Sequence, residues 1–220
     1  MDTVIVAAAG ASTRMKNDTS KIFHEVDGVP VLVRALAPAL KIPSIGRVII
    51  AVRLEDEARC RRMLRRWDWG AALVVPGGST RAESVWRALQ TVPSDDSTVV
   101  VHDAARPWAS ESLWRTVMRA ARVHGAAVPA IQVVDTLKIV DGGFVESTQP
   151  RNPRLCQIQT PQCFAASVLL KAYRRADAEL RNASPDDASL VEAMGHAVAT
   201  VAGETQNRKI TFPNDLPPQL

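Results

Sequence analysis

Residues 4–23 read VIVAAAGASTRMKNDTSKIF, an apolar run that passes into small residues and then into a polar stretch carrying Arg14 and Lys21. A short apolar run rich in valine and isoleucine is typical of a strand buried in a parallel sheet. The small residues after it let a ligand approach the backbone N–H groups, as an anion-binding loop requires. Gly10 lacks a second glycine at the spacing of a dinucleotide-binding turn, and no glycine directly precedes Lys16 as in a P-loop. The stretch predicts a strand followed by an anion-binding loop of another kind.

Strand and helix patterns alternate along residues 1–131. Short apolar runs are followed by longer segments whose apolar residues recur at helical spacing. The predicted strands lie at 3–10, 47–52, 72–78, 97–107 and 126–131, and the predicted helices at 30–40, 54–67, 80–92 and 110–125. Ser110 and Gly125 are typical of the two ends of the last helix. The alternation predicts an α/β fold with a mostly parallel central sheet and helices on both faces.

The pattern changes after residue 131. Residues 133–147 contain two alternating runs on either side of Asp141, Gly142 and Gly143, which predicts a β-hairpin. Because a lone hairpin is unstable in water, we expect this one to pack on a second subunit. Beyond it we expect a return to the core at 157–164, helices at 165–180 and 186–195, and closing strands at 197–203 and 208–212. The simplest organisation is one domain over 1–220 with a hairpin arm at about 132–155.

Two further loops have residues suited to a ligand at the carboxyl ends of the strands, where open α/β folds bind ligands. In PGGSTRAES (76–84), Gly78 would let a base approach the main chain and Ser84 would donate to a base carbonyl; a plain strand-to-helix turn is the alternative. In HDAARPW (102–108), Asp103 can hold a ribose hydroxyl or a magnesium ion, and Arg106 can bind a phosphate. A salt bridge between Asp103 and Arg106 is the alternative there.

Net charge, hydrophobic runs and cysteine content limit the classes of function that this protein can have. The net charge is +4, and much of the basic excess lies at 53–69, where acidic residues precede arginines as suits a surface helix. No nucleic-acid-binding module accompanies it, so we expect no nucleic-acid partner. No apolar run approaches the roughly 20 residues that span a bilayer, so we expect no membrane association. The three cysteines match no zinc pattern and no signal peptide is recognised, which predicts a cytoplasmic protein with reduced thiols.

Several motifs, in their order and spacing, resemble those of the 2-C-methyl-D-erythritol 4-phosphate cytidylyltransferases of the non-mevalonate isoprenoid pathway. The motifs cover nearly the whole chain: AAAGASTRM with Lys21, GGSTRAESV, VHDAARP, DTLK, QTPQCF and NRKITFPNDL. The resemblance implies a Rossmann-like nucleotidyltransferase domain with a β-hairpin arm that interlocks two subunits of a homodimer. It also implies transfer of CMP from CTP to 2-C-methyl-D-erythritol 4-phosphate, with Mg²⁺ as cofactor.

The resemblance further implies roles for individual residues. The residues implied to line the CTP pocket are Ala8, Ala9, Gly10, Gly78 and Ser84, and Gly78 and Ser84 are implied to lie near the cytosine. The residues implied to lie between the nucleotide and the acceptor are Asp103, Ala104 and Arg106, and Asp103 is also a possible metal ligand. Those in contact with the acceptor are Thr160, Lys209 and, from the arm of the neighbouring subunit, Thr136. The cations expected to take part in catalysis are Arg14, Lys21, Arg151 and Lys209.

The predicted reaction is attack of the acceptor's phosphate oxygen on the α-phosphorus of CTP, with pyrophosphate as leaving group. Phosphoryl transfer depends on positioning and charge stabilisation more than on a protein nucleophile. Because the acceptor phosphate is already ionised at neutral pH, no general base is required. We therefore expect His102 and His124 to be structural or surface residues.

Three positions depart from the family pattern. Asn152 stands where an arginine is usual, which makes Arg151 the candidate for the acceptor phosphate. Pro185 stands where a hydroxyl is expected near the acceptor, and Ile22 where a glutamine is usual. Two alternatives stay open: a pentulose- or pentitol-phosphate cytidylyltransferase, and a non-catalytic nucleotide-binding protein. The two alanines after Asp103 favour the isoprenoid enzyme, and the retained cations favour catalysis.

Overall fold

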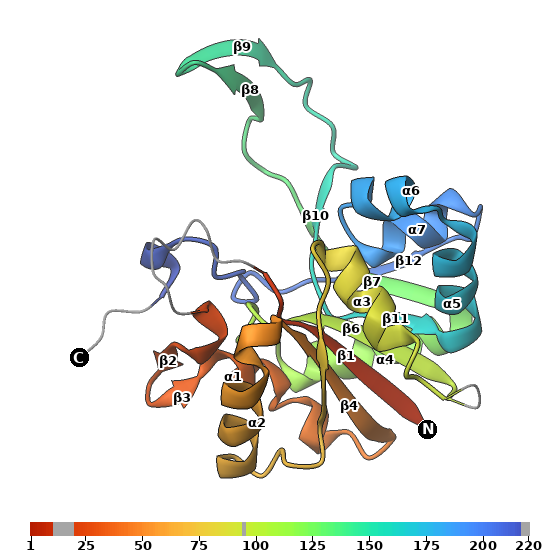
Figure 1. The fold of residues 1–220 in the computed structure, drawn as a ribbon. Helices are drawn as coiled ribbons and strands as arrows, with labels where there is room; N and C mark the ends of the chain where they lie inside the picture. Colours follow the sequence, from red (N-terminus) through yellow and green to blue (C-terminus); the bar gives the residue numbers. More distant parts are fainter. Residues whose placement is uncertain (11–19, 94–95, 217–220) are drawn as a thin grey trace.

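The core of the fold is an eight-stranded sheet with the order β10-β7-β11-β6-β1-β4-β5 and β12 beside β7 (Figure 1). The computed structural model describes residues 1–10, 20–93 and 96–216. The strands that pair in parallel at one side of the sheet are β1 (Asp2–Ala7), β4 (Ile45–Val52), β5 (Leu73–Pro76) and β6 (Thr98–Asp103). The remaining strands are β7 (Ala126–Gln132), β10 (Cys156–Ile158), β11 (Gln162–Ala165) and β12 (Ala199–Ala202). Among the described residues, β10 pairs antiparallel with β7, β11 pairs antiparallel with β6 and β7, and the other pairs of this sheet are parallel. The predicted mostly parallel sheet is therefore confirmed.

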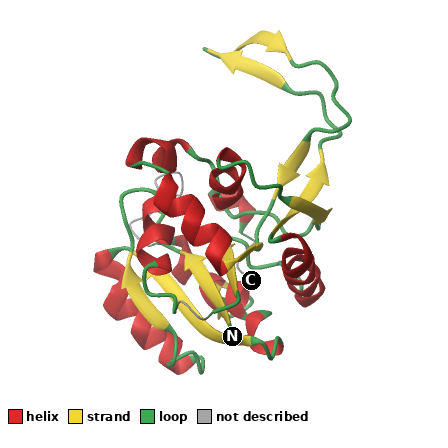
Figure 2. Cartoon of the chain, turned by 90° about the vertical axis from the view of Figure 1, so that its right-hand side faces the viewer, coloured by secondary structure: helices red, strands yellow, loops and turns green. Residues whose placement is uncertain are grey.

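Helices cover both faces of the sheet, as the alternation of its side chains requires (Figures 1 and 2). Val4 and Val6 of β1 pack in one apolar cluster, whereas Ile5 between them packs in the other. The helices of the first cluster are α1 (Val31–Leu36), α2 (Glu57–Arg66) and α4 (Glu111–His124). Those of the second are α3 (Arg81–Leu89), α5 (Ala166–Arg175) and α7 (Asp187–Ala193). Ser110 caps α4 and Gly125 ends it with a φ of 83°, both as predicted.

The predicted β-hairpin extends away from the sheet and its helices (Figures 1 and 2). It consists of β8 (Lys138–Asp141) and β9 (Phe144–Thr148), which pair antiparallel with one another. Gly142 and Gly143 form the turn with φ values of 54° and 86°, a conformation that glycine adopts without strain. Every residue of both strands is exposed, so the hairpin has no apolar face covered within this chain.

The structure differs from the predictions at several short elements. The segment 208–212 is not a strand; Ile210 instead donates from its backbone to the Ala105 carbonyl, 2.8 Å away, at the end of the sheet. The helix predicted at 30–40 ends at Leu36, and a 3₁₀ turn, η3 (Ala39–Lys41), follows Pro38. The predicted helix 54–67 begins with a 3₁₀ turn, η4 (Leu54–Asp56), and the predicted helix 165–180 ends at Arg175, with α6 (Ala178–Ala183) as a separate helix after it. The elements without a counterpart in the predictions are β2 (Glu25–Val26), β3 (Val29–Pro30), η2 (Lys21–Phe23) and η5 (Pro213–Asp215). Within the described ranges, no helix is both long and apolar enough to cross a bilayer.

Candidate active site

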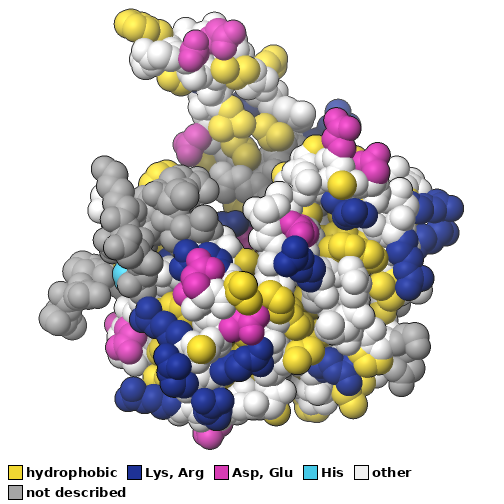
Figure 3. All heavy atoms as spheres, viewed as in Figure 1, with side chains coloured by type: hydrophobic (Ala, Val, Ile, Leu, Met, Phe, Trp, Pro, Cys, Tyr) yellow, Lys and Arg dark blue, Asp and Glu magenta, His cyan; other side chains and the backbone are white. Residues whose placement is uncertain are grey.

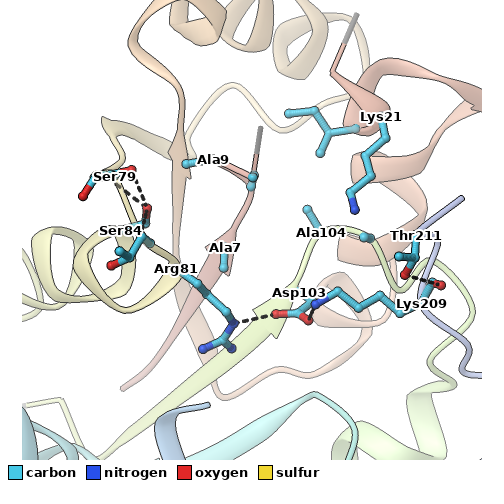
Figure 4. A pocket seen from close by; sticks show the side chains of 16 residues that line it. Ala7, Ala9, Lys21, Ser79, Arg81, Ser84, Asp103, Ala104, Lys209 and Thr211 are labelled. Atoms are coloured by element: carbon cyan, nitrogen blue, oxygen red, sulfur yellow. Dashed lines mark hydrogen bonds and ion pairs between the residues drawn. The ribbon is translucent and has the colours of Figure 1, made fainter. Parts of the chain in front are cut away.

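The loops after β1, β5 and β6 meet around a cavity of about 270 Å³ at the carboxyl ends of these strands. The predicted residues that line it are Ala8, Ala9, Gly10, Lys21, Gly78, Ser84, Asp103, Ala104 and Lys209. Figure 4 shows Asp103 between Arg81 and Lys209, with the Lys21 side chain directed toward the same space. The rule that ligands bind at strand carboxyl ends points to the same rim of the sheet as this cavity.

A second cavity, of about 390 Å³, adjoins the first. Arg81, Asp103 and Lys209 line both cavities and thus form their common boundary. The second cavity is also lined by the predicted residues Arg106 and Thr160. The site therefore consists of two adjoining cavities that share one charged boundary.

The glycine-rich loop after β5 is held close to β1. A Cβ at Gly77 would lie 2.4 Å from the Ala9 Cβ and 2.9 Å from the Ser84 Oγ, so only glycine fits there without displacing a neighbour. Ser84 accepts a hydrogen bond from the Gly78 backbone at 3.0 Å and donates to the Thr80 carbonyl at 2.8 Å. Thr80 also caps α3 by accepting from the Glu83 N–H, as the alternative for this loop predicts. The Ser84 hydroxyl thus fixes the shape of this wall of the cavity.

Asp103 carries the negative charge at the boundary of the two cavities. Its Oδ2 lies 2.7 Å from the Lys209 ammonium, and its Oδ1 accepts from the Arg81 Nε at 3.0 Å. Burial alone would raise the pKa of Asp103, but the guanidinium of Arg81 and the ammonium of Lys209 together hold this pKa well below its usual range. The described ion pairs of Asp103 are thus with Arg81 and Lys209, whereas Arg106 donates to the Asn207 carbonyl at 2.7 Å.

A buried polar chain fixes the backbone of Asp103. The Asp103 N–H donates to the Thr160 hydroxyl at 3.0 Å, and that hydroxyl lies 3.0 Å from His102 Nδ1. His102 Nε2 lies 3.1 Å from the Arg106 carbonyl oxygen, so this nitrogen carries the proton and Nδ1 accepts from Thr160. Burial lowers the pKa of His102 to about 4, which keeps the imidazole neutral at physiological pH. The structure assigns His102 a supporting role, in agreement with the expectation that it is structural.

Residues 207–211, which we call the C-terminal strap, connect two of the strand-end loops. The Lys21 ammonium donates to the Ile210 carbonyl at 2.9 Å, and Ile210 donates to the Ala105 carbonyl at 2.8 Å. The fully buried Asn207 donates from its side chain to the Thr160 carbonyl at 2.9 Å. The strap therefore places Lys209 opposite Asp103 and joins η2, which begins at Lys21, to the loop after β6.

Some predicted residues lie elsewhere. Arg14 lies outside the described residues. Thr136 and Arg151 are on the arm, where they line a separate hollow of about 490 Å³. Arg81 and its second partner, Asp187, were not predicted; Arg81 stands within the quoted motif GGSTRAES, but nothing in the sequence indicates its partners. Both are recognised only from the contacts between α3, α7 and the end of β6.

The donor set at the boundary does not form a metal cage. In the part of the chain that is described, no group of three or more His, Cys, Asp or Glu side chains could hold a metal ion. Both carboxylate oxygens of Asp103 already contact cations. Mg²⁺ binds several oxygen ligands and usually takes some from substrate phosphates, so a site built by the protein alone does not fit here.

The strand-end loops of the sheet surround two adjoining cavities lined by lysines, arginines and an aspartate, a surface suited to anionic ligands such as nucleotides and to an enzyme of the nucleotidyltransferase class. The family model described as 2-C-methyl-D-erythritol 4-phosphate cytidylyltransferase, IspD, matches residues 3–218. The chain belongs to this family.

Relatives of known name support the assignment over nearly the full length. A 2-C-methyl-D-erythritol 4-phosphate cytidylyltransferase of Bacillus mycoides is 37% identical over 98% of this chain and 95% of the relative. The chain is also 37% identical to the bifunctional enzyme IspD/IspF of Desulfotalea psychrophila, covering 97% of this chain and 54% of that protein. The crystal structure of the 2-C-methyl-D-erythritol 4-phosphate cytidylyltransferase of Thermus thermophilus superposes with a TM-score of 0.77 at 33% identity, covering 97% of this chain and 94% of that one.

Proposed function

We propose that this protein transfers CMP from CTP to 2-C-methyl-D-erythritol 4-phosphate, releasing pyrophosphate, in non-mevalonate isoprenoid synthesis. The observation that carries the proposal is the pair of adjoining cavities with Asp103 and Lys209 at their boundary. Two anionic reactants have to meet there, and Lys21, Arg106 and Lys209 supply positive charge around the meeting point.

CTP fits the cavity beside β1. The small side chains of Ala8 and Ala9 allow the phosphates and ribose of CTP to approach the backbone closely. Gly78 has no side chain and gives the flat cytosine space to bind. The triphosphate then points toward Lys21, and Arg14 is proposed to bind it as a second cation. The α-phosphorus comes to lie near the boundary, within reach of Lys209.

The acceptor fits the second cavity. Its phosphate is bound by Arg106 and Lys209, with Thr160 nearby, and one phosphate oxygen attacks the α-phosphorus of CTP in line with the leaving pyrophosphate. The new P–O bond forms as the bond to the β-phosphate oxygen breaks, and the electron pair leaves with pyrophosphate. The protein residues orient both anions and offset their repulsion; none of them has to remove a proton.

Magnesium is proposed to enter with the nucleotide. The phosphate oxygens of CTP supply ligands that the described side chains lack, and the ion reduces the charge of the triphosphate. Activity is therefore expected to depend on added Mg²⁺ and to be lost when the ion is removed with EDTA.

A homodimer formed through the arm is proposed as the active state. Phe144, Val134 and Val140 are 80%, 78% and 60% exposed, and hydrophobic side chains lie on the surface of the arm in Figure 3. Apolar groups in that number favour an interface over free exposure to water. In such a dimer, Thr136 and Arg151 of one arm would complete the acceptor cavity of the neighbouring subunit.

A cytoplasmic location is proposed together with this reaction. Cys60, Cys156 and Cys163 are all free thiols, a state that a reducing compartment maintains.

A direct assay tests the function. Pyrophosphate release is measured with CTP and Mg²⁺ while methylerythritol phosphate, ribulose 5-phosphate and ribitol 5-phosphate are offered in parallel. Turnover only with the first compound is the expected result. Clear turnover with a pentose compound and none with methylerythritol phosphate would overturn the proposal, and CTP binding without turnover would favour the non-catalytic alternative.

A further inference from the structure

Arg81 is a charged residue at the boundary of both cavities to which the reaction described above gives no task. It is the first residue of α3, and its side chain is one quarter exposed. Two carboxylates from distant parts of the chain contact its guanidinium: Asp103 at the end of β6 and Asp187 at the start of α7. The guanidinium therefore ties together three elements that meet at the site.

The contact with Asp187 is an anchor in the interior. The Asp187 side chain is 0% exposed, and its Oδ2 accepts from Arg81 Nη1 at 2.7 Å. Its other oxygen accepts from the buried Tyr173 hydroxyl at 2.6 Å. Tyr173 is in turn stacked on Trp86 with ring centroids 5.7 Å apart. A carboxylate held in this way has little freedom to move, so it fixes the direction of the guanidinium.

The contact with Asp103 transmits this anchoring to the cavity. Arg81 Nε holds Asp103 Oδ1 at 3.0 Å, which leaves Oδ2 directed at the Lys209 ammonium, 2.7 Å away. Charges alternate along Asp187, Arg81, Asp103 and Lys209, so each group is neutralised by its neighbour. A buried charge that loses its partner is strongly unfavourable, which makes the whole row act as one unit.

The geometry calls for arginine and excludes lysine. Two carboxylates approach the guanidinium through two of its nitrogens, Nε and Nη1. A planar fork with fixed donor directions can hold both at once, whereas a lysine ammonium is a single point charge on a flexible stem. Arg81→Lys therefore keeps the charge but loses the bridge.

We propose that Arg81, anchored on Asp187, is a positioning residue that fixes the Asp103 carboxylate and through it the Lys209 ammonium at the boundary of the two cavities. The inference rests on the proposed cytidylyl transfer. Arg81 acts through Asp103 and Lys209 and needs no contact with the reacting atoms. Its contribution is orientation of a cation that is used in the transition state.

The test compares Arg81→Lys with the unchanged protein in the cytidylyl transfer assay. We expect kcat to fall by about tenfold to 100-fold while the KM for CTP changes by less than about threefold, because misplacing a transition-state cation affects the chemical step more than nucleotide binding. The matched control is Arg115→Lys, an arginine that contacts Glu111 at 2.8 Å on α4. It should leave both constants unchanged.

Asp187→Asn supplies an independent variant that keeps the shape of the side chain. It should lower kcat in the same direction, and in the Arg81→Lys background it should add little, because both changes break one row of contacts. An unchanged kcat in a folded Arg81→Lys protein would overturn the inference. It would also be overturned if kcat in the double variant fell by the product of the two single reductions, because the two substitutions would then act independently. Should Arg81→Lys not fold, an unchanged kcat in Asp187→Asn overturns it. Absence of turnover by the unchanged protein would instead contradict the proposed function.

Discussion

Lys21 and Ile210 stand 189 residues apart in the sequence, yet the Lys21 ammonium donates to the Ile210 carbonyl at 2.9 Å. The contact brings the start of η2 against the C-terminal strap, so that Lys21 and Lys209 line the same cavity (Figure 4). Lysines from opposite ends of the sequence thus line one cavity.

Replacing Lys21 by methionine should remove a cation from the triphosphate and leave the fold in place. We expect kcat to fall by about 100-fold or more. The free energy of unfolding should change by only about 1 kcal/mol, the usual contribution of one hydrogen bond. Steady-state kinetics and urea unfolding measure the two effects. Lys41→Met, at an exposed lysine 3.9 Å from Glu111, is the control and should alter neither. A Lys21→Met protein with normal kcat would refute the role of this lysine.

Gly77→Ala should weaken nucleotide binding. The added Cβ would lie 2.4 Å from the Ala9 Cβ, so the glycine loop or the first loop has to move away from its place at the cavity. We expect the KM for CTP to rise by about tenfold, a loss of ordinary binding contacts. Gly70→Ala is the control, because its Cβ would meet nothing closer than Arg65 Cγ at 3.5 Å. Equal KM values for the two variants would show that the close approach has no role.

His102 should make the fold sensitive to acid. Its pKa is lowered to about 4 by burial, whereas an unfolded histidine has a pKa of about 6.5. Between these values the unfolded chain binds more protons, so stability falls as the pH falls, by roughly 1.4 kcal/mol per pH unit from this group. Urea unfolding from pH 7.5 to 4.5 measures the slope. His102→Gln should flatten it, and the exposed His124→Gln should not; equal slopes in both variants would contradict the assignment.

The arm should determine the oligomeric state. Phe144→Ser replaces an 80% exposed apolar side chain at the hairpin and should shift the protein from dimer to monomer in light scattering at micromolar concentration. Leu54→Ser, at a side chain 74% exposed on η4, is the matched control and should stay dimeric. If the unchanged protein is a fully active monomer, the shared-site proposal is wrong.

Mixing two inactive variants tests whether the arm serves the neighbouring subunit. Lys209→Ala damages a subunit's own cavity, and Arg151→Ala damages the arm. After subunit exchange, half of the dimers carry one of each, and one of their two sites contains both native residues if the arm acts across the dimer. Activity should therefore recover to about a quarter of the unchanged protein. No recovery, despite mixed dimers seen by mass spectrometry, would show that the arm serves its own subunit.

The sequence was sufficient for the features that depend on local pattern. The buried strand 2–7, the hairpin at Asp141 to Phe144 and the capped helix α4 each have a periodicity or a turn residue that identifies them. The resemblance of the motifs also located most residues of the first cavity, because the motifs group residues by a shared role and need no information on where they lie in space. The tight turn with Asp27 and Gly28, where φ is 49° and 72°, has a comparable local signal in its Asp-Gly pair.

Other features depend on contacts between distant segments. The alternation at 208–212 suggested a strand, but Ile210 bonds to Ala105 across the end of the sheet, and no local pattern encodes that route. Arg81 and Asp187 are 106 residues apart, and no local pattern at either residue indicates its partner. Only the folded arrangement, which brings the starts of α3 and α7 together, turns them into a bridge.

The C-terminal strap also has a consequence for the order in which activity arises during synthesis. Residues 207–211 provide Lys209 and a partner for Lys21, and they are made after every strand of the sheet. Synthesis runs from the N-terminus, so a chain that stops before residue 207 holds the residues of every strand but lacks Lys209 and the Ile210 carbonyl. Such a chain has no lysine opposite Asp103, and nucleotide turnover requires the strap to be made and in place.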